Sequence, residues 1–391
     1  MASVSARGIS SVVARRAMHS TNAARQSVAA TTAAGNANAM ISLEKIDARV
    51  FCLGTKGGNP VTIFASPTPL PGSIQQKLAT TCDWESVVVV SAPTPTMSFF
   101  MPSGEEVSFC AHAAIGGAIA MRGTGKGGSR SSRDFQASMT GEPFTVDSAG
   151  IGDDEGNNNE KNQDENNGPD DNDGSSSSSS KSCCLRMREV RFNEAPLSQA
   201  AMTTLEKWSD RLDWSSTRSP LNGTPRNASV ARPKTLVELA SVEALQKAGT
   251  PSSDDGSFAN ACEAMDDSTG VYLYAPRQIN RSEDGGQKLS SCYEYECRQF
   301  PRSSGYPEDP ATGIAAAALA ASLQFGGGSQ EGNRHLTAAA SNYEIYQGTA
   351  MGRPSLIEVV NLQKDENSGR LSFGLQGRVE IDATSTIQVS E

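Results

Sequence analysis

Two adjacent carboxylates, Glu308 and Asp309, stand directly before an alanine-rich run in YPEDPATGIAAAALAASLQF, residues 306–325. Alanine has the highest helix propensity, so the run predicts a buried helix that begins near Pro310, with Asp309 at its N-cap. The free N–H groups of a helix N-terminus bind small anions, and a carboxylate beside them can act as an acid or a base. Capping alone would also explain Asp309.

A second segment repeats this arrangement earlier in the chain. EVSFCAHAAIGGAIAMR, residues 106–122, places Cys110 and His112 before another run of small residues. When Cys110 is aligned with Asp309, both segments continue with small residues, a weak repeat whose long spacing favours two similar lobes over a solenoid. A helix N-terminus stabilises a nearby thiolate, so Cys110 is a candidate for chemistry; a buried and inert cysteine is the plainer explanation.

Length and charge limit what the protein can be. A chain of 391 residues can form two domains with sizeable cores. Its net charge is −10, and it shows no basic patch with interleaved aromatic residues, which argues against a nucleic-acid partner. No apolar run approaches the roughly 20 residues that cross a bilayer, so we expect no membrane span. The eight cysteines form no C-x-x-C pair and histidine is scarce, so no zinc site is expected.

Two segments differ in composition from the rest of the chain. The first forty residues contain Arg7, Arg15, Arg16 and Arg25 but no acidic residue, and they are rich in Ser and Ala. This composition is typical of an organellar transit peptide, mitochondrial more than plastid; a disordered leader on a cytoplasmic protein is the alternative. Residues 152–181 are rich in acids, Asn and Ser and contain no large apolar side chain, so they predict a disordered insertion.

The remaining pattern is mainly that of short strands. Runs rich in β-branched and aromatic residues recur between Gly, Pro, Ser and Asn, and the further helical candidates are residues 71–82 and 235–249. Residues 122–134 are expected to form a glycine-rich loop without the spacing of a phosphate-binding loop. The strands do not alternate regularly with helices, which argues against a Rossmann domain and a nicotinamide cofactor.

Many strands with two buried helices predict an α+β fold of two similar lobes, each a barrel-like, mostly antiparallel sheet around a central helix. We expect the first lobe over residues 43–146 and the second over residues 182–391. A last strand that returns to the first lobe is compatible with this division.

Five motifs, in this order, resemble the PhzF-like family, the relatives of the phenazine-biosynthesis isomerase. They are GNPVTIF (58–64), WESVVVV (84–90), EVSFCAHAAIGGA (106–118), EDPATGIAAAALAASL (308–323) and QGTAMGRPSLIEV (347–359). The resemblance runs from about Glu44 to the C-terminus, and EDPATG is its most specific part. It implies a fold like diaminopimelate epimerase, with the active site between two lobes. It also implies a cofactor-free isomerase that moves a proton on a small carboxylate substrate, often as a homodimer.

The same resemblance assigns roles to individual residues. Glu85 matches the acid/base glutamate, which suits a carboxyl whose pKa is raised by burial; a surface glutamate at a strand start is the alternative. His112 and Asp309 match the histidine and aspartate that bind or polarise the substrate from the two lobes. Arg353 is a weaker site candidate. The residues expected to contact the substrate, including the backbone N–H groups that hold its carboxylate, are Cys110, Ala111, Thr312, Gly313 and Ile314.

Two positions depart from the family pattern. Ile314 stands where a hydroxyl residue is usual, and Ala111 stands where glycine is usual, so the substrate of the phenazine isomerase is not assumed. Two other functions stay open. One is an epimerase that uses Cys110 as a catalytic thiol, although Asp309 occupies the place of the second thiol. The other is a ligand-binding protein without turnover.

Overall fold

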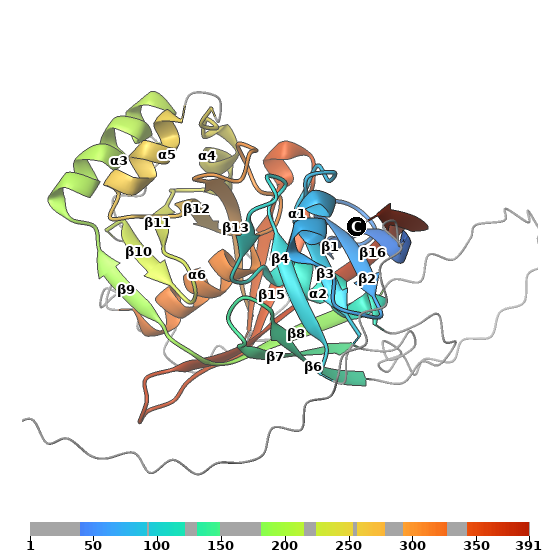
Figure 1. The fold of residues 1–391 in the computed structure, drawn as a ribbon. Coiled ribbons are helices and arrows are strands. Elements are labelled where there is room, and N and C mark those ends of the chain that lie inside the picture. Colours follow the sequence, from blue (N-terminus) through green and yellow to red (C-terminus); the bar gives the residue numbers. More distant parts are fainter. Residues whose placement is uncertain are drawn as a thin grey trace, which may run out of the picture. The chain divides into compact units, whose positions relative to one another are not determined.

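The computed structural model describes residues 40–91, 94–121, 131–148, 181–214, 224–252, 256–277, 292–326 and 342–390. The expected leader and acidic insertion lie outside these ranges except for their last residues, Met40 and Lys181. One continuous sheet curls around two helices, so the fold is α+β with two lobes, as the sequence predicts. Figure 1 shows the first lobe mainly in blue to green and the second in light green through yellow and orange to red.

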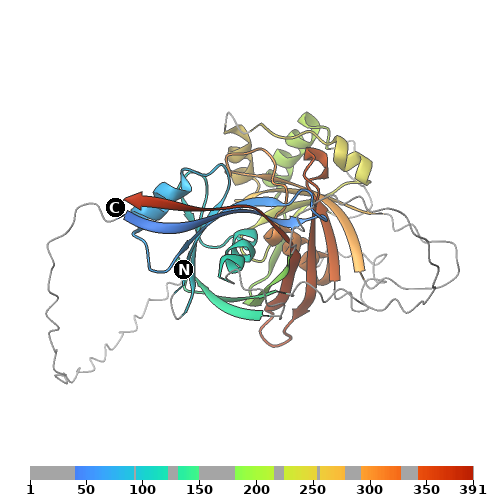
Figure 2. The ribbon, with the colours of Figure 1, turned by 90° about the vertical axis from the view of Figure 1, so that its right-hand side faces the viewer.

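The first lobe is a closed barrel. Its strands are β1 (Met40–Cys52), β2 (Asn59–Ser66), β3 (Ser86–Val90), β4 (Thr96–Phe100), β6 (Ser131–Ala137), β7 (Pro143–Ser148), β8 (Lys181–Val190) and β16 (Leu371–Ser390). They pair in that order, and β16 also pairs with β1, so the ring closes. The two-residue strand β5 (Glu106–Val107) adds to β4. Figure 2 shows the long β1–β16 pair as neighbouring blue and dark red ribbons.

The second lobe shares β16 and continues the sheet. Its other strands are β15 (Ser355–Lys364), β14 (Asn342–Gln347), β13 (Cys292–Pro301), β12 (Gly270–Pro276), β11 (Lys234–Glu238), β10 (Arg226–Ser229) and β9 (Asn193–Pro196), in the order of pairing. Within the described ranges β9 pairs with β10 alone, so this lobe is open at one edge.

The two lobes repeat one pattern of parallel and antiparallel pairs. In the first lobe β2 is parallel to β3, β3 is antiparallel to β4, and β4 is parallel to β6. In the second lobe β11, β12, β13 and β14 follow the same sequence of directions. A helix connects each of these parallel pairs, because parallel neighbours need a crossover connection. The internal repeat inferred from two short segments therefore extends over the sheet.

Each lobe encloses one central helix, α2 (Ala111–Ala120) in the first and α6 (Gly313–Phe325) in the second. Both helices are buried on every side over most of their length. Small residues allow this close packing. A Cβ at Gly116 would lie 2.9 Å from Cγ1 of Val61, and one at Gly117 would lie 3.0 Å from Sδ of Met97. These glycines thus serve packing.

Other helices cover the outer faces of the sheet. α1 (Gly72–Ala79) packs on the first lobe, and α3 (Gln199–Arg211), α4 (Val242–Lys247) and α5 (Ser257–Ala264) pack on the second. Successive side chains of a strand point to opposite faces of the sheet, so one strand contributes both to the core around the central helix and to the core under the outer helices. Tyr272 and Tyr274 of β12 belong to the core around α6, whereas Val271 and Leu273 pack under the outer helices. Within the described residues no helix is long and apolar enough to cross a membrane.

Three local predictions were wrong. The helix expected from Pro310 begins at Gly313, because the backbone of Asp309 is bridged to β13 through a bond from its N–H to the carbonyl of Gln299 (3.0 Å). The helix expected over 235–249 is β11 followed by α4, since the Thr and Val side chains of KTLVE fill the sheet between β10 and β12. The end of the expected loop 122–134 belongs to β6.

Candidate active site

The N-termini of the two central helices meet at one cavity of about 230 Å³. They approach closely, since a Cβ at Gly313 would lie 3.2 Å from Cβ of Ala111. Of the nine residues that the resemblance points to, eight line this cavity, namely Glu85, Cys110, Ala111, His112, Asp309, Thr312, Gly313 and Ile314. The structure therefore brings together side chains from both halves of the sequence, and the backbone N–H groups of both helix ends are aimed at the same space.

Glu85 directly precedes β3 and is buried, so it is not a surface residue at a strand start. Its Oε1 accepts a hydrogen bond from the hydroxyl of Tyr306. Its Oε2 has no hydrogen-bond partner among the described residues. Burial raises the pKa of the Glu85 carboxyl, while the bond from Tyr306 acts in the opposite direction. Burial also keeps the pKa of the Tyr306 phenol well above its ordinary value, so Tyr306 remains a donor.

His112 is the second residue of α2 and is buried. Its Nε2 lies 3.9 Å from Oε2 of Glu85, and its Nδ1 lies 3.3 Å from Nδ2 of Asn59. Burial lowers the pKa of His112 to about 4, so the imidazole is neutral near pH 7 and does not form an ion pair with Glu85. Nδ2 of Asn59 also donates to the backbone carbonyl of Ala311 (2.7 Å) and to Oδ1 of Asp309 (2.8 Å), so its contact with Nδ1 of His112 is the longest of the three. In the tautomer in which Nδ1 accepts from this amide, the ring proton lies on Nε2, on the side of Glu85.

Asp309 is held by three donors. The Oγ1 of Thr312 donates to Oδ2 (2.6 Å), and Nδ2 of Asn59 and the backbone N–H of Ala311 donate to Oδ1 (2.8 and 3.2 Å). Burial, and then the charge of Glu85, raise the pKa of Asp309 to about 6. Asp309 does not cap α6, whose N-cap is Thr312. It anchors the turn that leads into the helix and, through Asn59, is linked to His112.

Cys110 is the N-cap of α2, with its Sγ 3.4 Å from Nδ1 of His112. Burial raises the pKa of the Cys110 thiol, and the nearby Glu85 carboxylate adds to the effect. The helix N-terminus does not offset these contributions, so the thiol form is favoured near pH 7. This environment is unlike that of an activated cysteine.

Comparison with known sequences points to the same family as the motifs. A family model of phenazine biosynthesis-like proteins matches residues 222–379. A protein of Deinococcus radiodurans, described as an uncharacterized isomerase, is 38% identical over 89 residues, which are 23% of this chain and 23% of that protein. The aligned segment thus spans about a quarter of that curated relative.

Solved structures extend the likeness to nearly the whole fold. A PhzF-family phenazine biosynthesis protein of Bacillus anthracis superposes with a TM-score of 0.62 at 14% identity, covering 89% of this chain and 99% of that one. A protein of Pseudomonas aeruginosa described as a "predicted epimerase" superposes with a TM-score of 0.60 at 19% identity, covering 88% of this chain and 99% of that one. The resemblance to the PhzF-like family is confirmed. At these identities the superpositions by themselves establish the fold.

The site also contains residues that sequence reasoning missed, although the PhzF-like motifs include most of them. Asn59 lies in GNPVTIF, and Tyr306 lies two positions before the first residue of EDPATG. Gln347 opens QGTAMGRPSLIEV; its Nε2 donates to the backbone carbonyl of Asp309 (2.6 Å) and to Oγ1 of Thr312 (3.1 Å). These contacts could have been suspected from polar residues inside the motifs, but no spacing rule identifies their partners.

Arg353 does not line the cavity. Its guanidinium lies over the ring of Trp84 at 4.6 Å, and that ring contacts Tyr306 with centroids 5.5 Å apart. Arg353 therefore supports the wall that holds Tyr306 against Glu85. Among the described residues there is no group of three or more His, Cys, Asp or Glu side chains that could hold a metal ion.

Proposed function

We propose that this protein is a cofactor-independent isomerase that moves a proton between two carbons of a small carboxylate substrate, with Glu85 as the acid/base. The supporting observation is the asymmetry of the Glu85 carboxyl. One oxygen is fixed by Tyr306, whereas the other is buried, unpartnered within the described structure and beside the cavity. A carboxyl held in this way keeps one oxygen free to exchange a proton, and its raised pKa brings proton affinity toward neutral pH.

The helix N-termini provide the place for the substrate carboxylate. Backbone N–H groups near Ala111 and Gly313 converge on the cavity, and the helix dipoles favour an anion there. Binding in this position would put the carbon next to the carboxylate close to Glu85. Delocalisation of the resulting electron pair toward the carboxylate would be stabilised by the same N–H groups.

In the proposed reaction a single residue, Glu85, takes a proton from one carbon of the substrate and returns it to another. Ionised Glu85 removes a proton from one carbon, the electron pair shifts through the conjugated system, and the protonated Glu85 returns the proton to another carbon. Neutral His112, with its Nε2–H toward Glu85, can donate a hydrogen bond to the developing charge. Asp309 holds Asn59 and so the orientation of His112.

A screen for solvent deuterium incorporation into small carboxylic acids, without added metal or nucleotide, tests this function. Glu85→Gln keeps the shape of the side chain but cannot accept a proton, so exchange should fall by about 10²–10⁴-fold with little change in binding. Glu105→Gln is the matched control, because Glu105 lines the same cavity but is exposed. It should retain exchange within about threefold, as expected for an exposed charge.

Cys110→Ala separates the isomerase from a thiol-based epimerase. The isomerase should keep most of its exchange, whereas a catalytic thiol cannot be replaced by a methyl group. Retained exchange in Glu85→Gln together with loss in Cys110→Ala would replace the proposal with the epimerase. Binding without exchange in the wild type, for every acid tested, would favour a ligand-binding protein.

A further inference from the structure

The wall that the second lobe contributes to the cavity is basic and polar, unlike the wall of the first lobe. The first lobe presents the carboxyl groups of Glu85 and Glu105. The second lobe presents Asp309 and, in addition, the side chains Arg232, Lys234, Thr269, Gln299 and Arg302. The proton-transfer scheme above uses none of these five residues.

Gln299 is fully buried on β13, and neither its Oε1 nor its Nε2 has a hydrogen-bond partner among the described residues. A buried amide without a hydrogen-bond partner is destabilising, so most such groups in native proteins are paired. The amide packs against a glycine, whose lack of a side chain makes room for it. A Cβ at Gly270 would lie 2.5 Å from Nε2 of Gln299. The backbone carbonyl of Gln299 also receives the N–H of Asp309, which ties the amide to the site.

Lys234 begins β11 and is buried, with its Nζ donating to the carbonyl of Thr269 (3.2 Å). An ammonium group has three donors, so two remain for another acceptor. Within the described structure Lys234 forms no ion pair. Burial, and then the charge of Arg232, lower the pKa of Lys234 to about 7, while Asp309 acts in the opposite direction.

The two arginines on this wall differ in whether they form an ion pair. Arg302 is paired with Asp267 at 2.6 Å. Arg232 is exposed at the cavity and has no ion-pair partner among the residues described. Arg232 and Lys234 carry like charges and line the same cavity, so an anion between them would relieve their repulsion. The charge pattern and the orphaned amide thus favour the same kind of ligand.

We propose that Lys234, Gln299 and Arg232 form a subsite for a second carboxylate, so that the substrate is a small dicarboxylic acid. This inference rests on the proposed function, since the first carboxylate is the one at the helix N-termini. Lys234 and Arg232 supply the charge, and Nε2 of Gln299 donates to one carboxylate oxygen. Oε1 of Gln299 accepts from a hydroxyl or amino group next to that carboxylate.

Binding of matched acids tests the subsite. The probes are malonate, succinate and glutarate, each compared with the monocarboxylate of the same carbon number, propionate, butyrate or valerate. Calorimetric titration of the wild type should show that at least one dicarboxylate binds about tenfold or more tightly than its monocarboxylate, as a charge-assisted pair allows. Lys234→Met should abolish this preference while the monocarboxylate affinity stays within about twofold.

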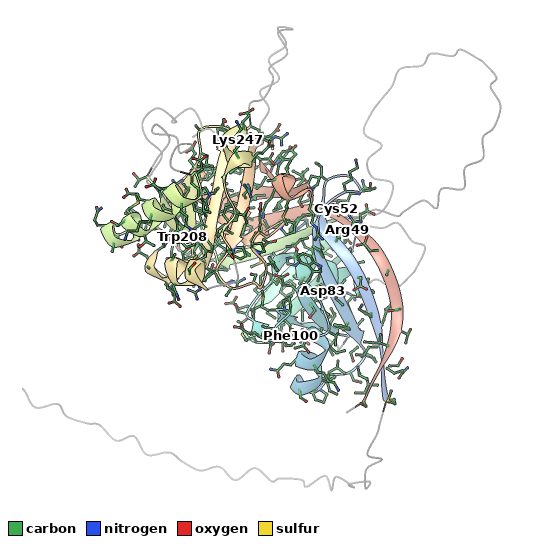
Figure 3. All side chains as sticks on the ribbon, turned by 90° about the horizontal axis from the view of Figure 1, so that it is seen from above. Arg49, Cys52, Asp83, Phe100, Trp208 and Lys247 are labelled. Atoms are coloured by element: carbon green, nitrogen blue, oxygen red, sulfur yellow. The ribbon has the colours of Figure 1, made fainter. Side chains whose placement is uncertain are left out.

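Lys247→Met is the matched control, because Lys247 is an exposed lysine at the end of α4, on the outside of the second lobe (Figure 3). It should keep the preference. Gln299→Leu provides a second, independent variant. If the amide awaits a ligand, the leucine should leave the thermal midpoint unchanged or raise it, and the dicarboxylate preference should fall. A lower midpoint with an unchanged preference would make Gln299 structural and would contradict its role in the subsite.

The dicarboxylate preference should depend on pH in a defined direction. Lys234 is charged below its pKa of about 7, so the dicarboxylate preference should weaken as the pH rises from 6 to 8. The groups that act on Lys234 are Arg232, Asp309, Cys262 and Arg302. Asp309 and Lys234 titrate in neighbouring ranges, so the decisive comparison is with Lys234→Met, in which this part of the pH dependence should vanish.

Failure of this inference can be told from failure of the proposed function. A wild type without any dicarboxylate preference, or a preference retained in both Lys234→Met and Gln299→Leu, would overturn the subsite and leave proton transfer on monocarboxylates intact. Because binding rather than turnover is measured, absence of deuterium exchange would contradict the isomerase without affecting the result on the subsite.

Discussion

When α2 and α6 are aligned on their N-caps, Cys110 is equivalent to Thr312 and His112 is equivalent to Ile314. The alignment of Cys110 with Asp309, made from sequence, was therefore offset by three residues. Both helix ends offer the same backbone N–H groups to the cavity, but their side chains differ. A repeated scaffold thus gives both lobes one way of attracting an anion, while each lobe adds its own chemistry.

The supports of the two helix ends differ as well. In the second lobe Gln347 joins Asp309, Thr312 and Tyr272, whose hydroxyl donates to Oε1 of Gln347 (3.0 Å). Neither helix has a side-chain cap bond, and in the first lobe the contact of His112 is to a single side chain of β2, Asn59, whose amide also donates to Asp309. Under the proposed function, we expect the second lobe to position the substrate and the first lobe, which carries Glu85 and His112, to exchange the proton.

The largest expected effect that sharpens this comparison is that of Asp309→Asn. The new amide would keep an acceptor for Asn59 and for the N–H of Ala311, but its Nδ2 would replace the acceptor of the Thr312 hydroxyl, and the carboxylate charge beside the cavity would be lost. We expect kcat/KM for exchange to fall by about 10²-fold, with KM raised as well as kcat lowered, because positioning is lost along with charge. Steady-state kinetics beside Glu85→Gln measure the difference. An unchanged KM in Asp309→Asn would contradict the division of roles between the lobes.

Tyr306→Phe should lower kcat/KM by a smaller factor and should shift its pH profile in a defined direction. The hydroxyl stabilises the ionised form of Glu85, so its removal raises the pKa of Glu85 further. If ionised Glu85 is the base, the rising limb of the pH profile of kcat/KM should move to higher pH, with a loss of about tenfold at pH 6. Tyr293→Phe is the control, since the ring of Tyr293 packs against Tyr343 away from the cavity. A limb that moves to lower pH would refute the role of Tyr306.

The smallest expected effect concerns the contact between the two helix ends. A methyl group at Gly313 would lie 3.1 Å from Cδ1 of Leu375 and 3.2 Å from both Cβ of Ala111 and Cζ of Phe51. Gly313→Ala should therefore destabilise the protein by about 1–3 kcal/mol, as overpacking does.

Adding Ala111→Gly to Gly313→Ala should recover part of this loss, since it removes one of the three contacts. Chemical denaturation of the two single variants and the double variant gives the coupling free energy, which we expect to be at least about 0.5 kcal/mol for residues in contact. Additive effects would show that the two helix ends do not touch in solution.

Several features followed from the sequence alone. The small residues of α2 and α6 predicted buried helices, since a helix without an amphipathic face has to be covered on all sides. The β-branched and aromatic runs predicted most strands, and the motifs around Glu85, His112 and Asp309 pointed to one site. Local composition carries this information because helix propensity and strand alternation depend on neighbours along the chain.

Other features were decided by the tertiary structure. TLVE reads as a helix start, but β10 and β12 give it a strand's hydrogen bonds, and Asp309 reads as a cap, but β13 holds it outside the helix. Lys234 and Gln299 carry no local signal, because each looks like an ordinary polar residue of a strand. Their burial, the unpaired amide of Gln299 and their place at the same cavity as Asp309 exist only once the sheet has curled around α6, since desolvation and pairing depend on contacts between distant segments.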